Sequence, residues 1–195
     1  MAVVKSWYAV DTVLGLNFNL SYATTVNVAS SVTSNSTTSD LAESMQVIAP
    51  DLLGTCRKGT DMSEWILLKA STTVIQYQLV SFDDGYNANP CTSGMGLSGA
   101  QLLALCQVQT YGGVAAASVD PGANPVFWGM IRGAGAQVFV SGSAGTGVAV
   151  NSGTSAGYIS ISTTGTAIKG VVLLVSGASG ATECMIYYPR ITALS

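Results

Sequence analysis

The chain has 195 residues, of which only 9% are charged; its formal net charge is -3 and it contains no histidine. Nucleic-acid binding needs many cationic contacts, and no basic cluster occurs beyond Arg57-Lys58, so we expect no nucleic-acid partner. The absence of histidine removes the commonest general base at neutral pH and the commonest metal ligand. The length suits one domain with a core, plus an arm or a small second lobe.

The low charge is combined with a high apolar content. Hydrophobic residues make up 48% of the chain and the mean hydropathy is +0.44. A lone soluble molecule of this composition would expose apolar patches, so we expect other subunits to cover part of its surface. The alternative is a β-protein rich in serine, threonine, glycine and alanine, whose small residues raise the hydropathy without any interface.

The four cysteines stand at positions 56, 91, 106 and 184, with no C-x-x-C pair. Their dispersal favours buried, small apolar side chains in a reducing compartment, and two disulfides formed on folding are the alternative. The N-terminus does not read as a signal peptide, because Lys5 is followed by few apolar residues before Asp11. No apolar run is long enough to span a bilayer, so we expect no membrane partner.

Residues 1–50 are interpreted as an N-terminal arm with edge strands, and residues 51–195 as a β-barrel domain. The arm alternates apolar and polar residues near its start and becomes rich in serine and threonine after Val26. Such a segment suits an arm that leaves its domain and lies on a neighbour; an ordinary pair of edge strands with a polar loop is the alternative. Asp40 and Glu43 have the spacing of a helix cap, so a helical turn to about Gln46 is expected before Pro50.

Residues 53–82 predict a hairpin, in which two strands joined by a turn pair with each other. The first run, residues 65–70, is almost wholly apolar. The second, residues 74–82, alternates with a period of two, as a half-buried strand requires. Trp65, Tyr77 and Leu79 are the expected anchors of a sheet face.

The remainder predicts further short strands separated by turns. Asp83-Asp84-Gly85 and Asp120-Pro121-Gly122 are turn signals, and residues 87–99 are expected to form a loop. The expected strands include a buried one at residues 100–108, an aromatic one at residues 125–132, short ones within the glycine-rich residues 133–157, and closing ones at residues 158–162, 170–174 and 184–188. About nine such strands with Gly/Pro punctuation predict an all-β barrel or sandwich.

Motifs for catalysis or cofactor binding are weak. Residues 142–147 are rich in glycine but lack the Gly-Lys-Ser/Thr ending of a phosphate loop. The carboxylate pairs Asp83-Asp84 and Asp61 with Glu64 lie in expected turns, where acids usually act as solvated caps. Calcium is a weaker alternative, with oxygen ligands from Asp83, Asp84 and Asn87 or from Asp120 and Asn124. We therefore expect no enzyme activity, no cofactor and no metal.

The stretch LGTCRKGTDMSEWILLKASTTVIQYQLVSF, residues 53–82, resembles the opening of a family of small proteins encoded beside the capsid genes of tailed bacteriophages. Members of that family are decoration, or cement, proteins on the outside of the head. Further matching segments are residues 100–108 (AQLLALCQV), residues 125–129 (PVFWG), Arg132-Gly133, residues 168–173 (IKGVVL) and Tyr188-Pro189. The order of these segments carries the resemblance, which leaves the first fifty residues unmatched.

The resemblance implies a small β-tulip-like barrel or sandwich with an extended N-terminal arm; a jelly roll is the alternative fold. It implies a homotrimer at three-fold positions of a capsid, bound to the major capsid protein on the outer surface of a virion that is assembled in the host cytoplasm. We expect the arm residues Trp7, Tyr8, Phe18 and Tyr22 to contact the capsid or a neighbouring subunit. The competing hypothesis is a head-fibre or tail-tip module that binds glycans through exposed aromatic residues.

Overall fold

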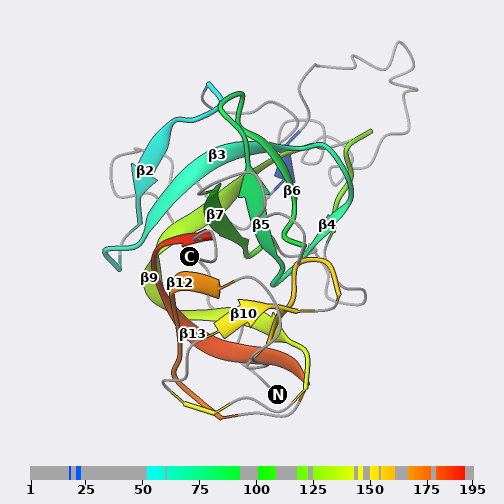
Figure 1. Ribbon diagram of the computed structural model, residues 1–195. Helices are drawn as coiled ribbons and strands as arrows, with labels where there is room; N and C mark the ends of the chain where they lie inside the picture. The colour runs from blue at the N-terminus through cyan, green and yellow to red at the C-terminus, as the bar shows by residue number, and fades with distance from the viewer. Residues whose placement is uncertain are drawn as a thin grey trace, which may run out of the picture.

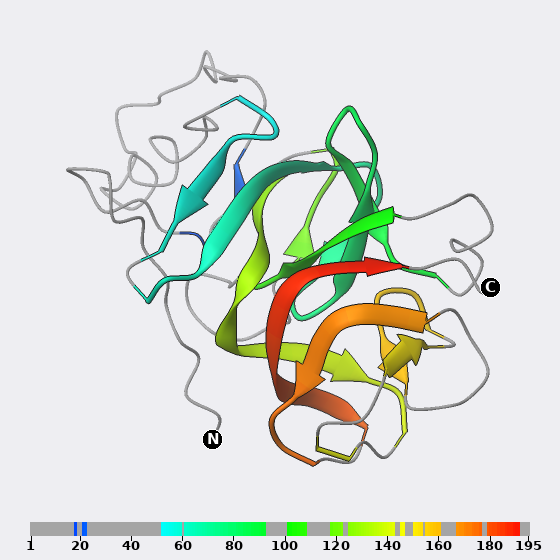
Figure 2. The same cartoon turned by 60° about the vertical axis from the view of Figure 1, so that its left-hand side comes forward.

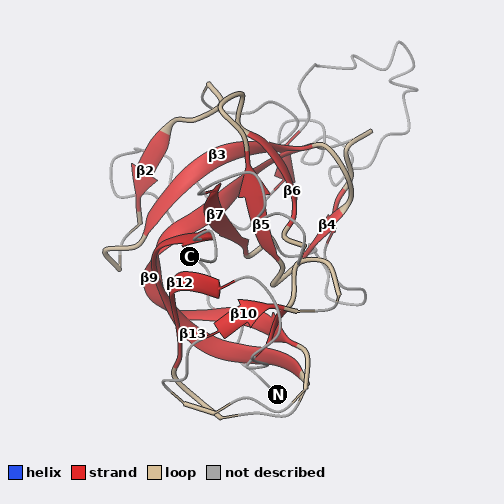
Figure 3. Cartoon of the chain, viewed as in Figure 1, coloured by secondary structure: helices blue, strands red, loops and turns tan. Residues whose placement is uncertain are grey.

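The computed structural model describes residues 18, 21–22, 52–59, 61–92, 101–108, 118–122, 125–142, 145–146, 150–153, 155–160, 167–176 and 179–191. This described part contains strands and no helix, which confirms the predicted all-β barrel or sandwich (Figure 1, Figure 3). The strands are β1 (Ser21–Tyr22), β2 (Cys56–Lys58), β3 (Glu64–Ala70), β4 (Val74–Ile75), β5 (Leu79–Phe82), β6 (Asn87–Pro90), β7 (Gln101–Cys106), β8 (Ser118–Val119), β9 (Val126–Val140), β10 (Val150–Ser152), β11 (Ile159–Ser160), β12 (Ala167–Leu173) and β13 (Gly180–Ile191).

Strand β9 organises the fold because it belongs to two closed circuits of strands. Its first half pairs with β3 and β7, and its second half with β13 and β11. One circuit runs β9–β3–β6–β5–β7 and the other β9–β13–β12–β10–β11, each returning to β9. The strand bends between the two halves, near Gly133 and Gly135, and Figure 2 shows it passing from one circuit into the other. Glycine at 135 suits the bend, since its φ is 75°.

Strand β3 is buried on both faces, which explains why its sequence is almost continuously apolar. Trp65 and Leu67 belong to one core cluster, whereas Ile66 and Leu68 belong to a second cluster on the opposite face. Alternate residues of β3 therefore point into two different cores. The predicted roles of Trp65 and Leu79 as core anchors are confirmed, since both side chains are fully buried.

All four cysteines are free thiols. Cys91, Cys106 and Cys184 are buried, and burial raises the pKa of each thiol to about 12. These three behave as small apolar side chains, as predicted from their spacing. Cys56, by contrast, is exposed in β2.

The predicted pairing of the two runs within residues 53–82 is wrong. β3 pairs with β2, β6 and β9, and β6 separates it from β5. The second run is also interrupted, because β4 ends at Ile75 and Tyr77 has a left-handed φ of 69°. The Gln78 side chain holds this turn by accepting a hydrogen bond from the Ile75 N–H at 2.9 Å and donating one to the Ala156 carbonyl at 2.9 Å.

Other expectations are confirmed or corrected strand by strand. The buried strand expected at residues 100–108 is β7, and the turns at Asp83-Asp84-Gly85 and Asp120-Pro121-Gly122 are present. The loop expected at residues 87–99 contains a strand, β6, which lies between β3 and β5. The start of the glycine-rich segment continues β9 as far as Val140 and does not form a separate short strand. The helical turn expected from Asp40 to Gln46 lies outside the described residues.

Candidate functional site

The outward side of the β12–β13 strand pair is mainly apolar. Val172 and Met185 are opposite each other in the pairing of the two strands, and their side chains are 37% and 42% exposed. Leu174 and Tyr187 continue the same side of the pair by strand alternation and are also exposed. We call these four residues the outer β12–β13 face. The face is apolar except for Glu183, an exposed residue on the same side of β13 whose backbone carbonyl accepts a hydrogen bond from the Leu174 N–H. An exposed and mainly apolar strip is typical of a surface covered by another protein.

A bulge in β13 ends this face. Lys169 pairs with Arg190 and Val171 with Ile186, so one residue of β12 is opposite three residues of β13. The bulge breaks the strand alternation, and Tyr187 and Tyr188 are both exposed, at 61% and 43%. Tyr188 has a left-handed φ of 45°, an uncommon conformation for a bulky residue. The bulge therefore presents two adjacent phenol rings, with centroids 5.0 Å apart, at the surface.

Two charged residues of β3 and β9 fix these rings. The Tyr188 hydroxyl donates a hydrogen bond to Glu64 Oε2, and Arg132 donates one to Glu64 Oε1 at 2.9 Å. The Arg132 guanidinium carbon lies 5.5 Å from the centroid of the Tyr187 ring, within cation–π range. Glu64, Arg132, Tyr187 and Tyr188 thus form one cluster, which we call the tyrosine cluster. Three strands contribute to it.

The electrostatics of the tyrosine cluster keep its carboxylate ionised. The hydrogen bond from the Tyr188 hydroxyl is the largest cause that lowers the pKa of Glu64, and Arg132 lowers it further. The same hydrogen bond raises the pKa of Tyr188, so the phenol keeps its proton. A carboxylate held in the charged form by two donors is a structural acceptor, and it is poorly suited to donate a proton as a general acid.

Replacing Glu64 with glutamine is expected to lower the free energy of unfolding at pH 7 by about 1 kcal/mol, because the ion pair with Arg132 is lost. The folded-state pKa of Glu64 lies below its unfolded value of about 4.3. Its stabilising contribution is therefore fully present above that value and is lost as the pH falls through the folded-state pKa. Urea unfolding of both proteins between pH 7 and pH 3 measures the difference, which should shrink on acidification. Glu183→Gln on β13 is the control, and a Glu64 difference independent of pH would contradict the prediction.

The structure places the predicted arm residues differently from one another. Phe18 is fully buried in the core of its own chain, where its ring stacks on Trp65 at 4.9 Å and meets Trp128 edge-on at 5.2 Å. The prediction that Phe18 contacts a neighbour is therefore wrong, because no part of its side chain reaches the surface. Tyr22 belongs to β1, which pairs with β9. Trp7 and Tyr8 lie outside the described residues.

The carboxylate pairs weighed for catalysis have local structural roles. Asp83 Oδ1 accepts hydrogen bonds from the backbone N–H groups of Gly85 at 2.9 Å and Asn87 at 2.8 Å, and the Asn87 side chain adds two more bonds. Asp61 accepts one from the Ser63 N–H at 3.2 Å. Within the described ranges, no group of three or more His, Cys, Asp or Glu residues could hold a metal ion. Asp83 and Asp61 stabilise turns, as their sequence positions predict. Glu64, which was also expected in a turn, lies instead in β3.

Sequence reasoning missed the tyrosine cluster as a unit. From the sequence, Tyr187 and Tyr188 were assigned to the closing strand at residues 184–188, and Glu64 was considered as a turn acid. The sequence signal that comes nearest to indicating the cluster is the scarcity of charge. In a chain with so few charged residues, each one that lies in a strand is a candidate for a specific ion pair or hydrogen bond. In the part of the chain that the structure describes, no helix has the length and apolar character that a membrane crossing needs.

Comparison of the chain with protein-family models and with curated proteins finds no match. The resemblance to phage decoration proteins thus remains an expectation from the motifs quoted above. The outer β12–β13 face and the tyrosine cluster are thus the features of the described residues that bear on function, together with the composition.

Proposed function

We propose that the chain is a structural, non-enzymatic virion protein, a decoration or cement protein on the outside of a tailed-bacteriophage head. In this proposal it forms a homotrimer and stabilises contacts between major capsid proteins. The resemblance carried by the motifs of residues 53–195 supports the capsid location and the trimer. The outer β12–β13 face supplies a surface suited to permanent burial against protein.

The observation that carries the proposal is the exposed apolar strip of Val172, Leu174, Met185 and Tyr187. Permanent interfaces are larger and more apolar than transient ones, and only 9% of this chain is charged. Tyrosine and arginine are enriched where binding energy concentrates, and the tyrosine cluster holds both at the end of the strip. A pre-organised cluster loses little side-chain entropy when a partner covers it.

A trimer would convert weak contacts into durable attachment. Three equal patches on a cyclic oligomer bind three equal sites on a shell, and the second and third contacts form at high effective concentration. Each patch then needs only modest affinity for the attached trimer to resist release. Attached in this way, the protein holds neighbouring capsid subunits together.

The double variant Val172→Thr, Met185→Gln is expected to bind undecorated phage heads roughly tenfold or more weakly than the native protein, because two apolar contacts are removed. Threonine and glutamine are close in size to the valine and methionine that they replace, and they add no charge. Co-sedimentation of purified protein with heads measures the bound fraction. The matched control is Leu52→Gln, an 84% exposed apolar residue that lies outside the face.

Two results would overturn the proposal. One is no co-sedimentation of the native protein with heads that lack decoration. The other is a stable monomer in native mass measurement, since the proposal requires a trimer. Equal binding of the double variant and the native protein would leave the capsid role standing, but it would mean that the outer β12–β13 face is not the surface that contacts the head.

One observation favours the competing hypothesis of a glycan-binding module. A pocket with aromatic walls and carboxylates lies on the other circuit of strands, beside β5 and β7. It does not overlap the tyrosine cluster, so the two roles can coexist in one protein.

A further inference from the structure

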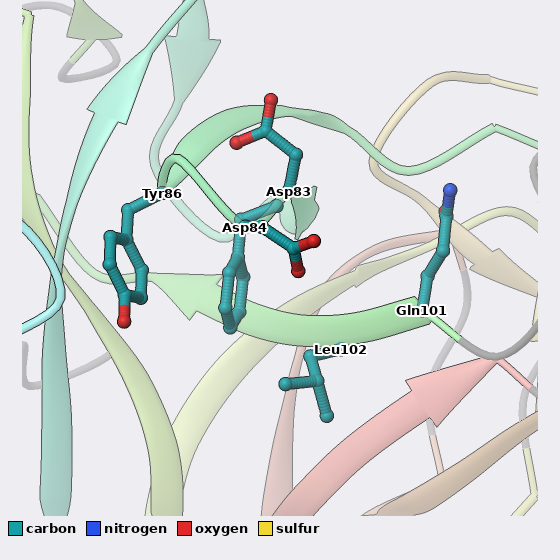
Figure 4. Close-up of a pocket in the computed structure, with 6 residues that line it drawn as sticks. Asp83, Asp84, Tyr86, Gln101 and Leu102 are labelled. Atoms are coloured by element: carbon teal, nitrogen blue, oxygen red, sulfur yellow. The ribbon is translucent and has the colours of Figure 1, made fainter.

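A pocket of about 610 Å³ opens between the β5–β6 turn and the start of β7 (Figure 4). The residues that line it are Phe82, Asp83, Asp84, Tyr86, Gln101 and Leu102. In Figure 4 the Asp84 carboxylate extends toward the side of the pocket where Gln101 stands, and the Tyr86 ring is at the opposite end. The volume is suited to one or two sugar rings and lies within the range of ordinary ligand pockets.

The aromatic end of the pocket is held in place before any ligand arrives. The Tyr86 ring lies against Gly54, where an added Cβ would be 2.2 Å from the ring carbon Cζ. The Tyr86 backbone is also fixed on both sides: its N–H donates to the Asp83 carbonyl at 2.9 Å, and its carbonyl accepts from the Lys69 N–H at 3.0 Å. Phe82 and Tyr86 both pack on the second core cluster. Such a fixed aromatic wall binds without first losing side-chain entropy.

The polar end of the pocket offers hydrogen-bond acceptors. Among the residues that the structure describes, Gln101 Oε1 is buried and accepts no hydrogen bond, and the Asp84 carboxylate forms none. Asp83, in contrast, is already saturated by Gly85 and Asn87. A buried acceptor without a donor costs free energy, and a ligand hydroxyl group recovers that cost when the Gln101 amide turns its shielded oxygen into the pocket.

We propose that this pocket binds a neutral sugar residue of a glycan. A sugar offers what the walls lack: several hydroxyl donors for Asp84 and Gln101, and an apolar C–H face for the Tyr86 or Phe82 ring. The two carboxylates and the net charge of -3 disfavour an anionic glycan. A simple cation is the weaker fit, because Asp83 is saturated and Asp84 is solvent-exposed. This inference does not rest on the capsid role.

The test uses saturation-transfer NMR on the full chain with four neutral probes: the methyl glycosides of glucose, galactose, mannose and N-acetylglucosamine. A ligand of this size is expected to bind with a Kd of about 1 mM. The expected result is transfer to at least one glycoside. Asp84→Asn and Gln101→Met should each weaken that binding roughly fivefold or more, because each variant alters one acceptor. The matched control is Asp120→Asn, an exposed turn carboxylate outside the pocket, which should leave binding unchanged.

Thermal unfolding of each variant shows that the fold is retained, as expected for an exposed acid and for a replacement of similar size. Absence of transfer to all four glycosides would overturn the proposal. Transfer that neither Asp84→Asn nor Gln101→Met reduces would also overturn it, because the sugar would then lie elsewhere. Binding of N-acetyl-lysine amide, with no binding of any glycoside, would identify a cation site instead and would equally reject the proposal. Sugar binding and head binding are measured in separate experiments. A protein that fails to bind heads would therefore reject the capsid role without affecting the sugar-binding proposal.

Discussion

Replacing Phe18 with alanine is expected to lower the free energy of unfolding by about 3–5 kcal/mol. The ring is fully buried, stacks on Trp65 with an interplanar angle of 11° and meets Trp128 at 74°. Removing it would leave a cavity beside two large indole rings that are themselves fully buried and held by the sheet. Urea unfolding followed by tryptophan fluorescence measures the loss.

The control for Phe18→Ala is Leu52→Ala, because Leu52 is 84% exposed and its replacement should change stability by less than about 0.5 kcal/mol. A loss below about 1 kcal/mol for Phe18→Ala would contradict the prediction and would mean that the chain fills this position in another way. The result also bears on the arm, since Phe18 ties residues near the N-terminus to the core of the same chain. An aromatic residue in an alternating run gives the same sequence pattern whether it packs on its own sheet or on a neighbour's.

Continuous apolar runs were the part of the fold that could be predicted best. β3 and β7 were both expected as strands. β3 and residues 103–106 of β7 are buried because their alternate side chains enter the two core clusters on opposite faces. The alternating run of residues 74–82 was misleading, because hydropathy carries no information on φ. Tyr77 adopts a left-handed conformation there, and the hydrogen bonds of Gln78 stabilise the turn.

Strand order and the candidate sites could not be read from the sequence. β6 lies between β3 and β5 and runs parallel to β3, which no local pattern of residues 87–90 reveals. The tyrosine cluster joins residues that are 68 and 124 positions apart, and its hydrogen bonds exist only after β9 and β13 have closed the sheet. Gln101 carries no sequence signal either, since an unpaired acceptor is a property of the folded pocket.

Replacing Gly170 with alanine is expected to be among the most damaging single changes, with a loss of about 3 kcal/mol or more in the free energy of unfolding. Gly170 has a φ of +80°, and an added Cβ would lie 2.3 Å from the Tyr187 carbonyl oxygen. The backbone of the bulge would have to move away. Tyr187 and Tyr188 would then lose the positions in which they meet Arg132 and Glu64. Urea unfolding measures the stability, and co-sedimentation with heads measures the effect on the proposed binding surface.

Gly142→Ala is a matched control for Gly170→Ala, because Gly142 has nearly the same φ, +85°, with no atom within 4 Å of an added Cβ. Gly142→Ala should lower the free energy of unfolding by about 1–2 kcal/mol, which is the cost of placing alanine in a left-handed conformation. It should leave head binding unchanged. The difference between the two variants thus isolates the close backbone approach at the bulge from the left-handed conformation. Equal losses would mean that conformation alone matters at Gly170 and that the bulge tolerates a side chain there. The larger loss at Gly170, accompanied by weaker head binding, would instead tie the exposure of the tyrosine pair to this one close contact between β12 and β13.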